Sequence, residues 1–411
     1  MPTWILPEYS QLSGVALDDA DLAALAPFCP RQLAVTPSFS GGGYDLAASS
    51  WVGTIRTPNG SLILQPKVAI SRLLFLLSYT LDPDRWRDVP FDYQTSDSLV
   101  EAIIPGFVHQ VRRAIRQGLL QGYRAREDTL TTVRGRIDFA QQLRRHHGRT
   151  PPVEVVYDEF TDDIVENRLL KAAVNRLGRL QLRSPASRSA LRTLGSAFDR
   201  VQLQHYDPRE LPTVTYTRLN EHYRPAVELA RLILQASSFD LAHGAARSSA
   251  FLVNMNSVFE AFVTVALREA LGADERSFPV PAKAPALRLD DDRQIRLKPD
   301  LTWLRDRRRI FVGDVKYKRL GSAGYLHPDL YQALAYTVAA ELPSAVLIYA
   351  AGEADAGTHR VRHVSKNLHV RTLDLGAEPD QILKQVALLA DEVRTLVQPP
   401  HTAQKQSWSA A

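Results

Sequence analysis

The most informative stretch of the sequence is QIRLKPDLTWLRDRRRIFVGDVKYK, residues 294–318. Apolar and aromatic residues on either side of its arginine-rich centre predict two strands joined by a tight turn. A turn centred on Arg307 places Asp300 directly across from Asp314 in the resulting hairpin. Side chains two apart on a strand share a face, so Asp314 and Lys316 both point toward Asp300.

Two carboxylates and one ammonium group therefore meet at one place in the predicted hairpin. Like charges directly opposite one another on a sheet repel, and a cation between them relieves that repulsion. Oxygen ligands without a thiolate or imidazole nearby favour Mg²⁺, or Mn²⁺, over zinc. Such an ion keeps several waters, and one of them can attack a phosphodiester. Lys316 would orient that water and stabilise the charge that develops.

The order Pro299-Asp300 and then Asp314-Val315-Lys316 resembles the PD-(D/E)xK nuclease signature, in which acid, acid and lysine have these roles. The alternative is an ordinary charge-paired surface on an exposed hairpin, because so short a motif also occurs by chance.

A helix predicted over residues 328–342 follows the hairpin, and on it Gln332 and Tyr336 share a face. This order of residues resembles the RecB-like branch of the same superfamily: an acid, then acid-x-Lys, then Gln-x-x-x-Tyr on the next helix. Members of that branch place a metal-binding Glu on an upstream helix, and Glu260 has that position in the helix predicted over residues 254–271. The alternative role for Glu260 is to keep that helix soluble.

The composition is that of an ordinary globular protein, with 45% apolar and 23% charged residues. Lys and Arg outnumber Asp and Glu by 50 to 45, which permits a polyanionic partner without arguing for one. The single cysteine, Cys29, excludes internal disulfides and Cys-based zinc sites. We find no secretory signal and no apolar run long enough to span a bilayer, and we expect a cytoplasmic protein.

The chain length suggests two or three domains, and the patterning predicts a mixed α/β fold class. The expected parts are a β-rich N-terminal domain (1–90), a mainly helical middle region (91–244), an α/β nuclease domain (245–398) and a disordered tail (399–411). The first part contains a hairpin around Pro58-Asn59-Gly60, and the second opens with a helix over residues 96–123. The Gly-rich segment 41–43 lacks the Lys-Ser/Thr that completes a P-loop, so any chemical energy must come from a partner.

Several separated blocks in the first two parts resemble the McrC family. They are Gln65-Pro66-Lys67, Val133-Arg134-Gly135-Arg136-Ile137-Asp138, Tyr157-Asp158-Glu159-Phe160-Thr161-Asp162-Asp163 and Glu166-Asn167-Arg168-Leu169-Leu170-Lys171, in that order. We expect the acidic block to lead into a helix, where carboxylates favour the amino end. We also expect Glu166-Asn167-Arg168 to fix that helix against Arg134-Gly135-Arg136.

McrC proteins are the nuclease subunits of McrBC-type, modification-dependent restriction systems, and they carry a C-terminal PD-(D/E)xK domain. The resemblance implies an endonuclease that uses Mg²⁺ to cut double-stranded, cytosine-modified DNA. It also implies a McrB-like AAA+ GTPase partner, which this chain would contact through its N-terminal part and stimulate. The implied catalytic residues are Asp300, Asp314 and Lys316, the accessory residues Gln332 and Tyr336, and the metal ligands Asp300, Asp314 and Glu260. Two alternatives stay open: a cutting-inactive adaptor that activates the GTPase, and a stand-alone RecB-like repair nuclease.

Overall fold

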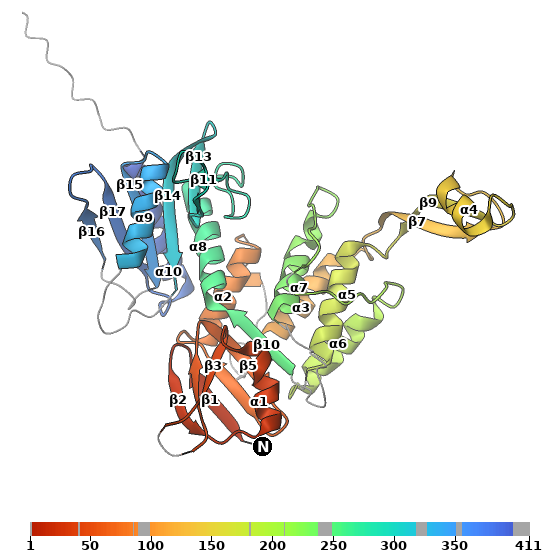
Figure 1. Cartoon of the computed structure of the whole chain (residues 1–411), viewed down its shortest axis with the longest axis horizontal. Coiled ribbons are helices and arrows are strands. Elements are labelled where there is room, and N and C mark those ends of the chain that lie inside the picture. The colour runs from red at the N-terminus through yellow and green to blue at the C-terminus, as the bar shows by residue number, and fades with distance from the viewer. Residues whose placement is uncertain are drawn as a thin grey trace, which may run out of the picture.

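A computed structural model describes residues 2–39, 42–84, 86–88, 99–180, 182–208, 210–236, 249–317, 327–350 and 356–397. Figure 1 shows an N-terminal β module, a bundle of helices, an arm that projects from the bundle and a C-terminal α/β module. The mixed α/β class and the β-rich start expected from the sequence are confirmed. The tail expected to be disordered (399–411) lies outside the described residues.

Two sheets enclose the core of the N-terminal module. The first has the strand order β1-β6-β5-β10, and the second has the order β2-β4-β3. Their strands are β1 (Thr3–Pro7), β2 (Gln11–Val15), β3 (Leu33–Pro37), β4 (Tyr44–Ala48), β5 (Trp51–Arg56), β6 (Ser61–Gln65) and β10 (Ser249–Asn254), and the helical turns are α1 (Asp19–Leu25) and η1 (Ala26–Phe28). The hairpin predicted around Pro58-Asn59-Gly60 is β5 and β6. Leucines from both sheets pack into one core with Phe28.

Strand β10 comes from far along the chain and completes the first sheet by pairing with β5. Gly53 makes this possible, because a Cβ there would lie 2.0 Å from the carbonyl oxygen of Phe251. The helix predicted over residues 254–271 begins at Met255 with Asn254 as its cap, and the strand that precedes it was not predicted. A division of domains at residue 244 stays a prediction, and β10 lies beyond it.

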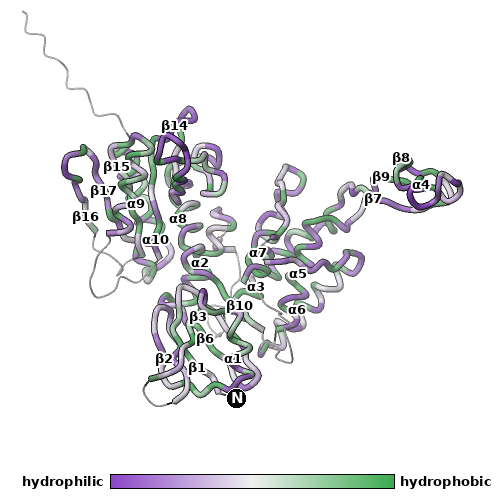
Figure 2. Tube along the Cα trace, viewed as in Figure 1, coloured by the Kyte–Doolittle hydropathy of each residue, from purple (hydrophilic) through white to green (hydrophobic). Residues whose placement is uncertain are grey.

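Five long helices form the bundle and its contact with the C-terminal module. They are α2 (Ile70–Leu81), α3 (Leu99–Ala114), α5 (Val165–Gly178), α6 (Pro185–Ser196) and α7 (Arg224–Ala236), with short turns η2 (Trp86–Asp88) and η3 (Glu221–Tyr223). The helix predicted over residues 96–123 is thus too long, since α3 ends at Ala114 and a strand begins at Gly122. In Figure 2 hydrophobic residues follow these packed helices and the strands of both modules.

The arm is a long antiparallel ladder that stands clear of the bundle (Figure 1). It contains β7 (Gly122–Leu130), β8 (Arg136–Ile137), α4 (Phe139–His146) and β9 (Val153–Thr161). The acidic block 157–163 was expected only to lead into a helix, but its residues 157–161 belong to β9 and pair with β7. Gly135 has a φ of 74°, and a Cβ there would lie 2.5 Å from the carbonyl oxygen of Val156, which accounts for the glycine in this block.

The C-terminal module is a mixed five-stranded sheet of order β13-β14-β15-β17-β16 with helices on both faces. Its elements are α8 (Met255–Leu271), β13 (Leu301–Arg305), β14 (Arg308–Lys316), α9 (His327–Ala339), β15 (Ser344–Ala350), β16 (Gly357–Arg360), β17 (Asn367–Leu373) and α10 (Pro379–Leu396), with a small ladder of β11 (Leu287–Arg288) and β12 (Arg296–Leu297). Val315 and Ile348 belong to the core shared with α8 and α10, whereas Leu347 and Tyr349 pack with α9. The predicted alternation of strands and helices is confirmed, although β16 was missed.

No helix among the described residues combines the length and the apolar character needed to cross a membrane.

Candidate active site

The site is built on β14, which lies between β13 and the parallel strand β15. Val312, Asp314 and Lys316 alternate with Phe311, Gly313 and Val315, so the two charged side chains share the face covered by α9. Asp314 is only 1% exposed. An acid this deeply buried is not part of a solvated hairpin surface, which excludes that alternative.

The predicted hairpin register is confirmed at the end of the hairpin away from the turn, where Leu301 pairs with Gly313. Asp306 and Arg307 form the turn and both have positive φ, and an irregularity between Trp303 and Leu304 shifts the register by one residue. The first strand is shorter than expected, because residues 296–297 pair with β11 instead.

Asp300 lies just before β13 and is held by the backbone of the opposite strand. Its Oδ2 accepts a hydrogen bond of 2.9 Å from the amide of Val315. Asp314 lies beside Asp300, as the register predicted, and each acid affects the pKa of the other. Lys316 Nζ contacts Asp314 Oδ2, and the acid, acid and lysine therefore meet at one point.

The electrostatics of this group show an excess of buried negative charge. Burial and the neighbouring Asp300 raise the pKa of Asp314 well above its usual range. Burial also raises the pKa of Asp300, and Glu260 adds to that effect. The pKa of Glu260 is raised by burial and then by Asp314. Burial opposes the charge on Lys316, but the Asp314 carboxylate outweighs it and raises the pKa of Lys316.

Helix α9 brings the two predicted accessory residues to the same face of the sheet. Tyr336 is 1% exposed, and its hydroxyl donates to the carbonyl oxygen of Lys298 at 3.0 Å. Burial, and then the charges of Asp314 and Asp300, raise the pKa of Tyr336. Gln332, one turn earlier on α9, is exposed.

Whether these residues fit a metal ion can be judged from the donor atoms. Among the described residues, no three His, Cys, Asp or Glu side chains gather closely enough to enclose a metal by themselves. Mg²⁺ needs less, because it is commonly held by one or two carboxylates and keeps its waters. Asp300 and Asp314 are such a pair, and the raised pKa of each carboxyl indicates that negative charge is poorly compensated here, although Lys316 contacts Asp314 Oδ2. The Asp300 and Asp314 pair therefore fits Mg²⁺ or Mn²⁺.

Two residues that support this site, Asp329 on α9 and Tyr349 on β15, were not predicted from the sequence. Asp329 is 5% exposed, and its Oδ2 accepts a hydrogen bond of 2.5 Å from Tyr349. Its negative charge also helps to keep Lys316 protonated. Asp329 was visible only as an acid in the first turn of a helix, a place where acids are common without further function.

A cleft of about 2410 Å³ reaches Glu260 from the side of the helical bundle. Arg268 lines it two turns further along α8. Its side chain is buried, and its Nη1 has no hydrogen-bond partner among the described residues. A buried guanidinium nitrogen without a hydrogen-bond partner favours an anionic ligand, because such a donor is costly to leave unsatisfied.

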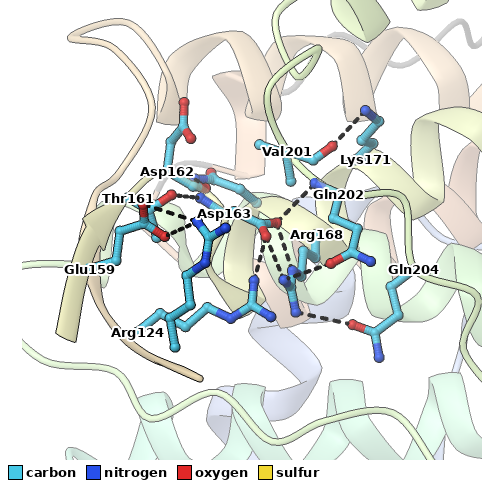
Figure 3. A network of polar contacts seen from close by, with 12 residues as sticks. Arg124, Glu159, Thr161, Asp162, Asp163, Arg168, Lys171, Val201, Gln202 and Gln204 are labelled. Atoms are coloured by element: carbon cyan, nitrogen blue, oxygen red, sulfur yellow. Dashed lines mark hydrogen bonds and ion pairs between the residues drawn. The ribbon is translucent and has the colours of Figure 1, made fainter. Parts of the chain in front are cut away.

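A second charged cluster, at the base of the arm, centres on Asp163 (Figure 3). Arg168 binds both of its carboxylate oxygens, Arg124 binds Oδ2 at 2.6 Å, and the amide of Gln202 binds Oδ1 at 2.9 Å. The expected contact of residues 166–168 with residues 134–136 was wrong, since Arg134 instead stacks on Tyr157. This cluster ties the arm, α5 and the segment after α6 together, which is a structural role.

Comparisons with known proteins give one consistent picture. The family described as "McrBC 5-methylcytosine restriction system component" matches residues 46–350. A relative from Escherichia coli (strain K12), "Type IV methyl-directed restriction enzyme EcoKMcrBC", is 22% identical over 356 residues, which are 80% of this chain and 99% of that protein. Among solved structures, the half-complex of Thermococcus gammatolerans McrB AAA+ hexamers with bound McrC matches with a TM-score of 0.53 at 18% identity. That match covers 95% of this chain and 100% of the matched chain, and it supports the fold.

Proposed function

Because the chain belongs to the McrBC 5-methylcytosine restriction system component family, with McrC as its counterpart, we propose that it is a Mg²⁺-dependent DNA endonuclease subunit. Its substrate would be double-stranded DNA that carries modified cytosine. The observation that carries this proposal is the buried contact of Asp300, Asp314 and Lys316 on one face of β14. The resemblance to the PD-(D/E)xK signature and the position of Tyr336 support it.

The residues of the candidate active site have distinct parts in this chemistry. Mg²⁺ held by Asp300 and Asp314 would neutralise charge on the phosphate and lower the pKa of a water molecule. Lys316, kept protonated beside Asp314, donates a hydrogen bond that orients the attacking water and stabilises charge developing on the phosphate oxygens. The amide of Val315 fixes the Asp300 carboxyl before any ligand arrives. The remaining groups act at the edges of this centre.

The hydroxyl of Tyr336 is committed to the carbonyl of Lys298, and its raised pKa keeps it neutral. It therefore supports the backbone that precedes Pro299-Asp300 and takes no proton from the water. Glu260, which lines the cleft, would add negative charge that favours a cation, and Arg268 would offer a contact for a phosphate farther along the DNA strand.

We further propose that the chain acts with a McrB-like AAA+ GTPase, whose hydrolysis of GTP it stimulates. The support is the likeness in fold to the complex of McrB AAA+ hexamers with bound McrC. This assignment also meets the expectation that a chain without a nucleotide-binding motif depends on a partner for energy.

The decisive experiment compares cleavage of methylated and unmethylated plasmid in the presence of Mg²⁺ and GTP. The wild-type protein, Asp314→Ala and the control Asp292→Ala are each tested with and without a McrB-like AAA+ GTPase. Asp292 is an exposed acid in the same module that takes no part in the site. We expect cleavage of methylated plasmid that needs the partner, survives Asp292→Ala and is lost in Asp314→Ala.

Other outcomes would contradict the proposal in different ways. Wild-type protein that stimulates GTP hydrolysis but never cuts would identify a cutting-inactive adaptor. Cutting without the partner, at the same rate on both plasmids, would identify a stand-alone nuclease.

A further inference from the structure

The N-terminal module touches the C-terminal module directly behind the candidate active site. Glu8 follows β1 and is 4% exposed, and Tyr317 follows Lys316 and is 2% exposed. The Tyr317 hydroxyl donates to Glu8 Oε1 at 2.7 Å, and the amide of Lys67 donates to the same oxygen at 2.6 Å. The ammonium group of Lys67 lies 4.3 Å from the centre of the Tyr317 ring. Residues that follow the carboxyl ends of the adjacent strands β1 and β6 therefore hold the residue next to Lys316.

The backbone of Tyr317 is held as well as its side chain. Its carbonyl oxygen accepts a hydrogen bond of 2.5 Å from the hydroxyl of Tyr9. Because both the ring and the peptide of Tyr317 are fixed, the carboxyl end of β14 cannot shift without breaking buried contacts. Lys316 is one residue away, so its position depends on them too.

The same module also holds the amino end of α8, the helix that carries Glu260. The amide of Met255 donates to the carbonyl oxygen of Ser50 at 2.9 Å, and Asn256 Nδ2 donates to Ser50 Oγ at 3.1 Å. Asn256 lies one turn before Glu260 on this helix. The strand and the helix that supply the charged groups of the site are therefore both fixed to the N-terminal module.

The buried polar contact of Glu8 with Tyr317 costs folding free energy, so stability alone does not explain it. Glu8 Oε2 is buried and has no hydrogen-bond partner among the described residues. A buried carboxylate that is only partly satisfied lowers stability unless its geometry is required elsewhere. An apolar pair of the same size would join the two modules at lower cost. The polar contact therefore indicates that the two modules must be held in one orientation. Hydrogen bonds can fix that orientation because they are directional.

We infer that Glu8 and Tyr317 are positioning residues, through which the N-terminal module sets the place of Lys316 relative to Asp300 and Asp314. This inference rests on the proposed nuclease function and extends it. If the GTPase partner contacts the N-terminal module, a small movement of that module reaches the reacting groups through Glu8 and Tyr317. The contact is then the route by which assembly controls cutting.

The test measures kcat and KM for cleavage of methylated DNA by the full-length protein in complex with the partner. Glu8→Gln and Tyr317→Phe remove a charge and a hydroxyl while keeping the shape of each side chain. The control is Tyr223→Phe, which removes an equally buried hydroxyl, one that accepts from the amide of Leu120 in the helical bundle. Thermal midpoints of all variants show that each is folded.

We expect each positioning variant to lower kcat about tenfold, because small displacements of reacting groups are expensive, with KM and GTP hydrolysis little changed. The double variant should be no slower than the slower single variant, since Glu8→Gln weakens and Tyr317→Phe removes the same hydrogen bond. Tyr223→Phe should keep the wild-type kcat even if it lowers the thermal midpoint.

Two results would overturn the inference while leaving the nuclease proposal intact. One is a wild-type kcat in Tyr317→Phe. The other is a double variant whose fold decrease in kcat equals the product of the two single decreases. A wild-type complex that does not cut would instead overturn the nuclease proposal, and the inference would fall with it.

Discussion

Asp314 is the residue at which function and stability are most clearly opposed. It is almost fully buried beside Asp300, and Lys316 is its cationic contact among the residues that the structure describes. The sequence predicted the meeting of these three residues, because the spacing of charged positions on paired strands fixes which side chains face one another. The burial of Asp314 was not predicted, since it depends on α9, which packs over the hairpin from a later part of the chain.

We predict that Asp314→Asn raises the thermal midpoint of the protein in the absence of divalent ions while abolishing cleavage. A neutral amide relieves the repulsion from Asp300 and Glu260, and each kcal/mol gained should raise the midpoint by about 2–4 °C. Scanning calorimetry with and without Mg²⁺ measures both effects. Mg²⁺ should raise the midpoint of the wild type and of Asp292→Asn, but not that of Asp314→Asn. A lower midpoint in Asp314→Asn without metal would contradict this account.

Among the elements, α5 shows which structural features a sequence pattern predicts and which it does not. The helix and its charged amino end were predicted, but the partners of Arg168 were not. They come from the acid just before the helix and from the segment after α6, which is a contact between distant positions. Capping and periodicity are local signals, whereas the choice of ion-pair partner depends on the finished fold.

We predict that the ion pair of Asp163 and Arg168 makes α5 sensitive to acid. The hydrogen bond from Arg168 lowers the pKa of Asp163 to about 2, below its value in an unfolded chain. Such a group stabilises the fold above about pH 4, and this contribution, about 2 kcal/mol, is lost as the pH falls through 2. Hydrogen exchange of the α5 amides should therefore accelerate in Asp163→Asn at pH 7. It should not accelerate in Asp162→Asn, whose carboxylate makes no ion pair with any described residue. Equal exchange in the two variants would argue against this role.

At the scale of the whole molecule, the parts are less separable than composition suggests. The sequence predicted the three regions, but not that β10 joins the first sheet or that Glu8 reaches Tyr317. A four-residue apolar run before a helix, residues 250–253, is compatible with either helix or strand, and only the open edge of β5 decides between them.

We predict that a fragment of residues 245–398 does not fold as a stable unit. Its first strand would lack β5, and Tyr317 would lose the Glu8 carboxylate that it binds in the full chain. The fragment should show a broad unfolding transition, and a peptide of residues 2–67 added in trans should sharpen it. A sharp transition of the fragment alone, equal to that of the same module in the full-length protein, would show that the C-terminal module is independent.

The late arrival of β10 also has a consequence for synthesis on the ribosome. Strand β5 must wait for a partner that is translated about 200 residues later. At about 5–20 residues per second this delay is roughly 10–40 s. Throughout it, β5 presents an unpaired edge, and Val52 and Ile55, which are fully buried in the finished protein, lack part of their cover. The nascent chain is thus a natural client for chaperones, and its yield in a cell should depend on translation speed between β5 and β10.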